Sequence, residues 1–147
     1  MNDPEPRKRV LVVEDDGWIR GFMRDLLVDE GYAVLEAADG RTAIRLASEL
    51  LPDALLLDVV MPDCNGVAVL RNLRSQRRTR CLPVIVLSAY PRMLTPESAT
   101  SVLCVLGKPF DVDVLLAAVR RAVEPPDQGI IVGPGLAPLA TVPVTIP

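Results

Sequence analysis

Five polar residues stand directly after apolar runs of the chain, and their side chains could together handle a phosphoryl group. They are Glu14, Asp15, Asp58, Ser88 and Lys108. Carboxylates that lie close together repel one another when ionised, so a cluster of them favours a hard divalent cation. Magnesium fits best, with manganese as a substitute, because it takes carboxylate and carbonyl oxygens and keeps several waters. Its preference for phosphate oxygens suggests phosphoryl chemistry in the same pocket.

Asp58 is the candidate nucleophile of this group. It ends a leucine run, and its attack on a phosphorus atom would give an aspartyl phosphate. The cation and the ammonium of Lys108 would neutralise charge on the transferring group. The hydroxyl of Ser88 could turn towards a phosphoryl oxygen, so that a local change of charge moves a loop. The plain alternative for each residue is a polar group that only caps a strand or a turn.

The elements that must position these residues are strands and helices in alternation. Apolar runs without polar alternation predict strands that are buried on both faces of a parallel sheet, at 10–13, 32–36, 54–57, 83–88 and 102–106. Apolar residues at helical spacing predict helices at 18–31, 40–51, 66–75 and 112–123. Segment 89–101 contains Pro91 and Pro96 and is predicted to be a loop with at most a short helix.

This alternation predicts an α/β fold, a doubly wound five-stranded parallel sheet with right-handed crossovers and helices on both faces. We expect the flavodoxin-like strand order 2-1-3-4-5. In that order the polar residues that follow the first, third, fourth and fifth strands converge on one pocket, at the edge of the sheet where such folds place their ligands.

Several details of the helices follow from the same pattern. Asp16 is expected to cap the first helix, which Gly31 ends, and Trp18 is expected to be partly buried on it. The apolar positions of this helix are Trp18, Ile19, Phe22, Leu26 and Leu27. On the second helix the apolar face should include Leu50 or Leu51. The arginine cluster of the third helix and its loop is expected to be a solvated helix end, with docking to an acidic partner as the alternative. It consists of Arg71, Arg74, Arg77, Arg78 and Arg80.

The composition excludes several classes of function. The chain has 147 residues, a formal net charge of −3 and no basic block, which argues against direct nucleic-acid binding. It has 3 cysteines and no histidine, so ordinary zinc sites are excluded and the thiols are expected to be reduced in a cytoplasmic protein. No signal peptide is readable, and no apolar stretch is long enough for a membrane span.

The two ends of the chain differ from its centre. Residues 1–7 are expected to be a flexible N-terminus, and 8–123 one domain. From 124 to 147 the chain is apolar and rich in proline and glycine, which predicts a loosely packed tail or a docking segment, with no output domain.

The ordered motifs closely resemble the receiver domain of two-component response regulators, of the stand-alone type, over about residues 8–123. The matching pieces are 12–16 after the first strand, 58–62 with Gly66, 87–89, and 108–110. The intervals between Asp15, Asp58, Ser88 and Lys108 support the match.

The resemblance implies that Asp58 accepts a phosphoryl group from a phosphohistidine on a sensor histidine kinase or a phosphotransfer protein. It implies that Asp15, Asp58 and the backbone carbonyl of Val60 bind magnesium directly, and that Glu14 acts through water. Ser88 and Lys108 would bind the phosphoryl group. Such a protein catalyses its own phosphorylation and dephosphorylation but turns over no external substrate, and it signals by a change in docking to a downstream protein. A homodimer of the chain is the alternative partner in such docking.

Three departures from the family pattern keep a second interpretation open. Val105 stands where the family usually carries an aromatic residue, segment 89–107 is short and rich in proline, and no output domain follows. The alternative is a receiver-like interaction module that works without phosphorylation. A third hypothesis is a phosphatase of the haloacid-dehalogenase type, but such enzymes need an acid at the position of Val60.

Overall fold

The five predicted strands form one parallel sheet. The computed structural model describes residues 6–61, 64–89 and 101–124. The sheet contains β1 (Arg9–Val13), β2 (Ala33–Ala37), β3 (Ala54–Asp58), β6 (Val84–Ser88) and β7 (Cys104–Gly107). Its order is β2-β1-β3-β6-β7, and every neighbouring pair is parallel. Since β6 and β7 are the fourth and fifth strands of this sheet, the predicted order 2-1-3-4-5 is confirmed.

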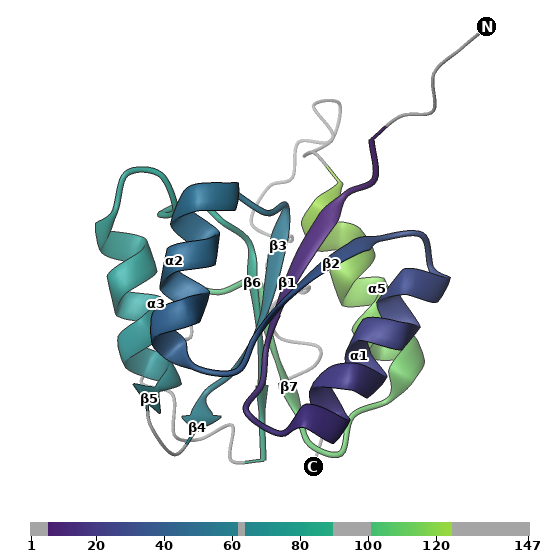
Figure 1. The fold of residues 1–147 in the computed structure, drawn as a ribbon. Helices are drawn as coiled ribbons and strands as arrows, with labels where there is room; N and C mark the ends of the chain where they lie inside the picture. The colour runs from purple at the N-terminus through teal and green to yellow at the C-terminus, as the bar shows by residue number, and fades with distance from the viewer. Residues whose placement is uncertain (1–5, 62–63, 90–100, 125–147) are drawn as a thin grey trace, which may run out of the picture.

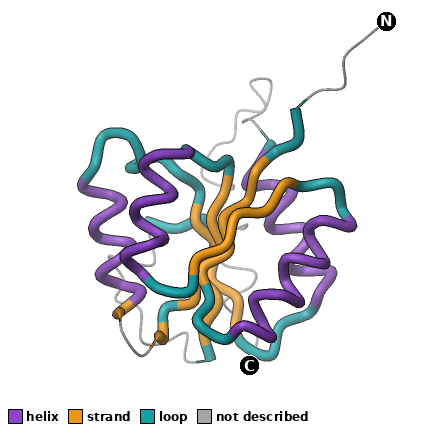
Figure 2. The backbone as a smooth tube through the Cα atoms, in the orientation of Figure 1, coloured by secondary structure: helices purple, strands orange, loops and turns teal. Residues whose placement is uncertain are grey.

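Helices cover both faces of the sheet, as predicted (Figure 1). On one face lie α1 (Gly17–Asp29) and α5 (Val112–Val123), and on the other lie α2 (Gly40–Leu50) and α3 (Gly66–Ser75). Figure 2 shows the strands as a twisted central layer between the two pairs of helices. Each face has its own apolar core, because successive side chains of a strand point to opposite faces. Leu11 and Leu57 belong to the α2/α3 core, whereas Val12 and Leu56 belong to the α1/α5 core.

Each of the four helices in the described residues begins with a side-chain cap at the carboxyl edge of the sheet. Asp16 caps α1 by accepting hydrogen bonds from the amides of Trp18 and Ile19, as predicted. The other caps are Asp39, Asn65 and Asp111. Caps of this kind satisfy amides that have no partner within the helix, so they fix where each helix leaves the edge that carries the polar cluster.

The predicted face of α1 was wrong in part, because Leu27 is buried as predicted but the aromatic residues are not. Trp18 is 89% exposed and Phe22 is 51% exposed, whereas Met23 and Leu27 are fully buried against the sheet. Apolar residues occupy two neighbouring stripes of this helix, and periodicity alone could not tell which of them faces the core. The aliphatic stripe faces the core and the aromatic stripe faces outward.

Several boundaries also differ from the predictions. Tyr32 is not part of β2, because its amide donates to the carbonyl of Leu27 in the turn that follows α1. The fifth strand begins at Cys104 rather than at residue 102. Leu50 and Leu51 are exposed, so neither continues the apolar face of α2. A short antiparallel pair, β4 (Val60–Met61) and β5 (Cys64–Asn65), was not predicted.

Arg74 is not part of a solvated helix end. Its guanidinium is partly buried and donates to the carbonyl oxygens of Ser101, at 2.6 Å from Nη2, and of Thr79 and Arg80. Burial lowers the pKa of this arginine. Arg74 therefore joins the end of α3 to the segment that leads into β7.

Several predictions lie outside the described residues. They concern the course of the chain between 90 and 100, the flexible start at 1–5 and the tail from 125 onward. None of the helices in the described part of the chain is long and apolar enough to cross a membrane.

Candidate functional site

The sheet register brings the predicted polar residues to one edge. Asp58 is paired with Leu87, and Ser88 with Gly107, so β3, β6 and β7 end at the same level. Val13 is paired with Leu57, which places Glu14 beside Asp58. This is the carboxyl edge of a parallel sheet, where loops are free to form a site.

Lys108 contacts both carboxylates at the centre of the cluster. Its Nζ lies 3.1 Å from Oε1 of Glu14 and 3.1 Å from Oδ2 of Asp58. Its main-chain amide donates to the carbonyl of Ser88 at 2.9 Å, so the end of β6 holds the start of the loop that carries the lysine. The ammonium is thus fixed between residues that are 94 and 50 positions away in the sequence.

The site combines buried and exposed side chains. Glu14 is 1% exposed, Asp58 is 5% exposed and Ser88 is fully buried. Asp15 is exposed, and Lys108 is partly exposed. Of the three acids, only Asp15 is exposed.

Burial perturbs the protonation of Glu14. Burial raises its pKa to about 7, the neighbouring charge of Asp58 adds to this effect, and the hydrogen bond from Lys108 opposes it. Burial alone would lower the pKa of Lys108, but its hydrogen bonds and charge interactions with Glu14 and Asp58 raise it. The lysine therefore stays charged, while Glu14 changes charge near neutral pH unless another cation joins the site.

The acidic residues are suited to a hard cation. Glu14, Asp15 and Asp58 each offer a carboxylate oxygen, and these atoms lie within 4.8 Å of one another. Three carboxylates around a single lysine leave excess negative charge, and carboxylate oxygens are the ligands that magnesium prefers. The donor set therefore fits the ion that the sequence predicts.

The loop after Asp58 depends on a close approach of α3. A Cβ atom on Gly66 would press against the Cα of Val59 and lie 2.9 Å from the carbonyl oxygen of Asp58. The amide of Gly66 donates to the carbonyl of Val59 at 3.1 Å. Only glycine lets α3 begin against the main chain of the candidate phosphoacceptor.

Not every predicted feature is placed by the described contacts. Val60 lies in β4, two residues after Asp58, but the role of its carbonyl as a ligand stays a prediction.

Sequence reasoning missed Arg20, whose guanidinium donates to the carbonyl of Glu14. Its only signal in the sequence is its place one turn into the helix that follows the acidic residues.

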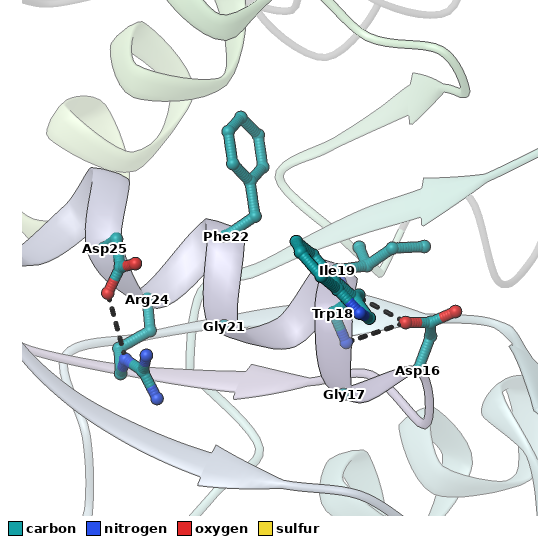
Figure 3. A pocket seen from close by; sticks show the side chains of 8 residues that line it. All are labelled: Asp16, Gly17, Trp18, Ile19, Gly21, Phe22, Arg24 and Asp25. Atoms are coloured by element: carbon teal, nitrogen blue, oxygen red, sulfur yellow. Dashed lines mark hydrogen bonds and ion pairs between the residues drawn. The ribbon is translucent and has the colours of Figure 1, made fainter.

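A groove along the outward side of α1 adjoins the acidic loop, residues 14–16 (Figure 3). Trp18, Ile19 and Phe22 line it, and all of them are exposed. A contiguous exposed apolar patch of this kind marks an interaction surface more often than an exposed single residue does.

Comparisons with known proteins agree with this geometry. Residues 10–120 match the model of the response regulator receiver domain. The chain is 34% identical over 120 residues to the transcriptional regulatory protein PdtaR of Mycobacterium tuberculosis, a match that covers 80% of this chain and 57% of PdtaR. It is 38% identical over 125 residues to the response regulator MprA of Mycolicibacterium vanbaalenii, with 82% of this chain and 53% of MprA covered. The chain thus spans little more than half the length of these relatives.

Solved structures show the same fold. The receiver domain of the sensor histidine kinase PA1611 from Pseudomonas aeruginosa, with a magnesium ion in its active-site cleft, aligns with a TM-score of 0.71 and 29% identity over 80% of this chain and 98% of that domain. The chemotaxis protein CheY4 of Vibrio cholerae aligns with a TM-score of 0.70 and 30% identity over 80% of this chain and 99% of that protein. The chain therefore belongs to the response regulator receiver domain family.

Proposed function

We propose that this chain is the phosphoacceptor of a two-component system and that Asp58 receives the phosphoryl group. The observation that supports this most directly is the buried carboxylate of Asp58, which has Lys108 at 3.1 Å and two further acids within reach of a shared cation. A receiver without this chemistry would have no need to bury two acids, Glu14 and Asp58, against one lysine beside a third, exposed acid.

The step would be an in-line displacement. An oxygen of the ionised Asp58 carboxylate forms a bond to phosphorus while the bond from phosphorus to the donor's imidazole nitrogen breaks, and the leaving imidazole takes a proton from solvent. Lys108 neutralises charge on the phosphoryl oxygens, and Ser88 offers a hydroxyl at the same edge. A bound magnesium ion, held by Glu14, Asp15, Asp58 and the Val60 carbonyl, would supply further charge neutralisation. The phosphoryl group ends on the chain's own Asp58 rather than on a released product, so we propose an acceptor rather than a turnover enzyme.

The donor would be a separate protein. The chain has no histidine, so it cannot carry the phosphohistidine itself. We propose a sensor histidine kinase or a phosphotransfer protein as the donor, and the exposed Trp18 and Phe22 beside the acidic loop as apolar anchors for its docking. A downstream protein would then recognise the phosphorylated state, in the cytoplasm.

The decisive test is the mass of the intact protein before and after incubation with acetyl phosphate and magnesium. The natural chain should gain one phosphoryl group, about 80 Da, and Asp58→Asn should gain none because an amide is not a nucleophile of this kind. Asp53→Asn is the matched control, since Asp53 lies just before the opposite end of β3 and should leave the gain intact. A gain that persists in Asp58→Asn would contradict the assignment.

A second function is favoured by Val105. This residue is 3% exposed and packs in the core on the α2/α3 face, where it leaves no aromatic ring to move inward upon phosphorylation. A receiver-like module that binds its partner without phosphorylation is consistent with that packing. A natural chain that binds magnesium but gains no mass with acetyl phosphate or with a histidine kinase would support this alternative.

A further inference from the structure

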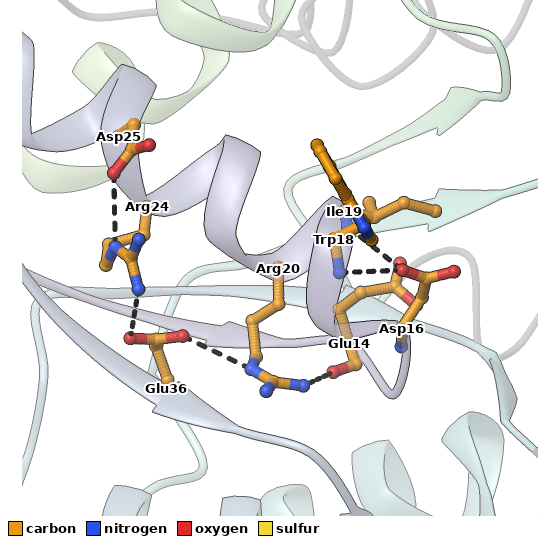
Figure 4. A network of polar contacts seen from close by, with 8 residues as sticks. All are labelled: Glu14, Asp16, Trp18, Ile19, Arg20, Arg24, Asp25 and Glu36. Atoms are coloured by element: carbon orange, nitrogen blue, oxygen red, sulfur yellow. Dashed lines mark hydrogen bonds and ion pairs between the residues drawn. The ribbon is translucent and has the colours of Figure 1, made fainter.

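Arg20 contacts the acidic loop through the main-chain carbonyl of Glu14 rather than through an acidic side chain (Figure 4). It lies one turn into α1, and its Nη1 donates to the carbonyl oxygen of Glu14 at 2.8 Å. Its Nε donates to Oε1 of Glu36 at 3.2 Å, and its side chain is 23% exposed. The guanidinium therefore bridges the end of β1 and a carboxylate of β2.

The main chain of Glu14 lies just beyond the last residue of β1. Its amide still donates to the carbonyl of Ala37 at 3.1 Å. Its own carbonyl, which belongs to the peptide that leads into Asp15, accepts the hydrogen bond from Arg20. This peptide joins Glu14 to Asp15, and one acidic side chain leaves the main chain on each side of it. Its orientation therefore sets the directions in which both side chains point.

The rest of the acidic loop is held from the site itself. Oε2 of Glu14 accepts a hydrogen bond from the amide of Asp16 at 3.2 Å, and Oε1 contacts Lys108. These contacts involve groups that a cation would engage. The contact from Arg20 does not, so it can persist whether or not a cation is bound.

A neighbouring arginine offers a natural comparison. Arg24 lies one turn further along α1 and also binds Glu36, at 3.3 Å, but its other described partner is Asp25 on its own helix. Arg24 therefore shares the tie between α1 and β2 with Arg20, while only Arg20 reaches the acidic loop (Figure 4).

We propose that Arg20 is a positioning residue for the divalent cation site, which holds the Glu14–Asp15 peptide so that both carboxylates face Asp58. The proposal rests on the proposed function in that it takes these acids to be the magnesium ligands. It predicts that loss of the guanidinium weakens magnesium binding although Arg20 touches no ligand oxygen.

The sign of this effect separates positioning from simple electrostatics. Arg20 is a cation close to a cation site, so its removal should tighten magnesium binding if charge alone matters. Loss of an outer partner that orients ligands instead weakens metal binding, by about tenfold or more. The two explanations therefore predict opposite changes.

The test is calorimetric titration of the full chain with magnesium chloride, for the natural protein and for Arg20→Met, Arg20→Lys and Arg24→Met. We expect Arg20→Met to bind magnesium about tenfold more weakly and Arg24→Met to stay within about twofold of the natural protein. Arg20→Lys keeps the charge but loses the planar set of guanidinium donors. Its magnesium affinity should therefore lie between those of Arg20→Met and Arg24→Met. Thermal unfolding shows whether each variant is folded, and Arg20→Lys decides the question if Arg20→Met does not fold.

Equal or tighter binding by a folded Arg20→Met variant would overturn the proposal. Amide hydrogen exchange of the metal-free protein provides a second readout, because the amide of Asp16 is bonded to Glu14. It should exchange several times faster in Arg20→Met and at the natural rate in Arg24→Met. If the natural chain does not bind magnesium, the metal role in the proposed function fails, and this exchange rate alone decides whether Arg20 holds the loop.

Discussion

The buried carboxylate of Glu14 should make the stability of the metal-free protein depend on pH. Burial raises its pKa from 4.5 to about 7, so the folded state holds this proton more tightly than the unfolded state does. The resulting stabilisation is fully present below pH 4.5 and is lost as the pH rises through about 7. We expect Glu14 to account for about 1–3 kcal/mol of this decline.

Urea unfolding in the presence of a chelator measures this effect. Glu14→Gln cannot titrate, so the difference in unfolding free energy between the natural chain and this variant should change between about pH 5 and pH 8. Glu49→Gln, on the exposed surface of α2, is the control and should show a constant difference. A constant difference for Glu14→Gln as well would mean that Glu14 is ionised throughout this range.

Gly66 should be intolerant of the smallest side chain. A Cβ atom there meets the main chain of Val59 and the carbonyl of Asp58, neither of which can rotate away. We expect Gly66→Ala to lower the free energy of unfolding by about 2–3 kcal/mol. Gly21→Ala is the matched control, because it lies within α1 with only the end of the Arg24 side chain nearby.

The control should change stability in the opposite direction. Alanine is favoured over glycine within a helix by up to about 1 kcal/mol, so Gly21→Ala should stabilise the protein. Unfolding in urea distinguishes the two substitutions. A neutral Gly66→Ala would show that α3 can shift away from the phosphoacceptor loop at no cost.

At the scale of elements, Arg74 is the residue that ties α3 to the entry of β7. Its hydrogen bonds reach the carbonyls of Ser101, Thr79 and Arg80. Arg74→Met keeps an apolar stem of similar length but leaves these acceptors without the guanidinium, so we expect a loss of about 2–3 kcal/mol. Arg71→Met, on the exposed side of the same helix, should change stability by less than about 0.5 kcal/mol in the same urea titration. Equal losses of unfolding free energy in the two variants would mean that Arg74 contributes no more to stability than a solvated arginine does.

The central strands were predictable because their environment is uniform, whereas the edge strand β2 is mostly half-buried. A strand between two layers of helices is buried on both sides, and a run such as that of β3 has no other plausible place in a small domain. The starts of the helices could also be predicted from the sequence, because the side chains of Asp16 and Asp39 cap α1 and α2. The boundaries at Tyr32 and Cys104 were off by one and two residues, because backbone contacts rather than residue types decide them.

The orientation of α1 was not predictable from its sequence. Trp18 and Phe22 form one apolar stripe, Met23 and Leu27 form the next, and both have helical spacing. Only the position of the sheet shows which stripe is inside. The same limit applies to Arg20 and Arg74, because an arginine that binds a carbonyl across the fold has the same local sequence signal as a solvated one.

The candidate site was predictable to the extent that it depends on strand ends. Polar residues at the ends of adjacent parallel strands must meet, and the contact of Lys108 with Glu14 and Asp58 follows from that rule. The burial of Glu14 was not predictable, because it depends on how closely the loops cover the edge. Its raised pKa is therefore visible only in the structure.

At the scale of the whole molecule, the site joins parts of the chain that no short-range contact connects. Glu14 and Asp15 follow β1, Asp58 ends β3 and Lys108 follows β7, so the site exists only when the central strands are paired. The unfolded chain presents its acids far apart and should bind magnesium weakly. A ligand that binds only the folded state stabilises the entire cooperative unit rather than one loop.

Magnesium should therefore raise the global stability of the natural chain. At a concentration of about 100 times the dissociation constant, the free energy of unfolding should increase by about 2.7 kcal/mol, measured by urea unfolding at about pH 8 with and without the ion. Asp15→Asn removes a carboxylate of the acidic group and should lose most of this increase. Asp16→Asn should retain it, because Asp16 lies outside that group and asparagine caps α1 as well as aspartate does. An equal increase in both variants would place the cation elsewhere, whereas an increase lost only with Asp15 would show that the ion binds at the carboxyl edge of the sheet and stabilises the fold from there.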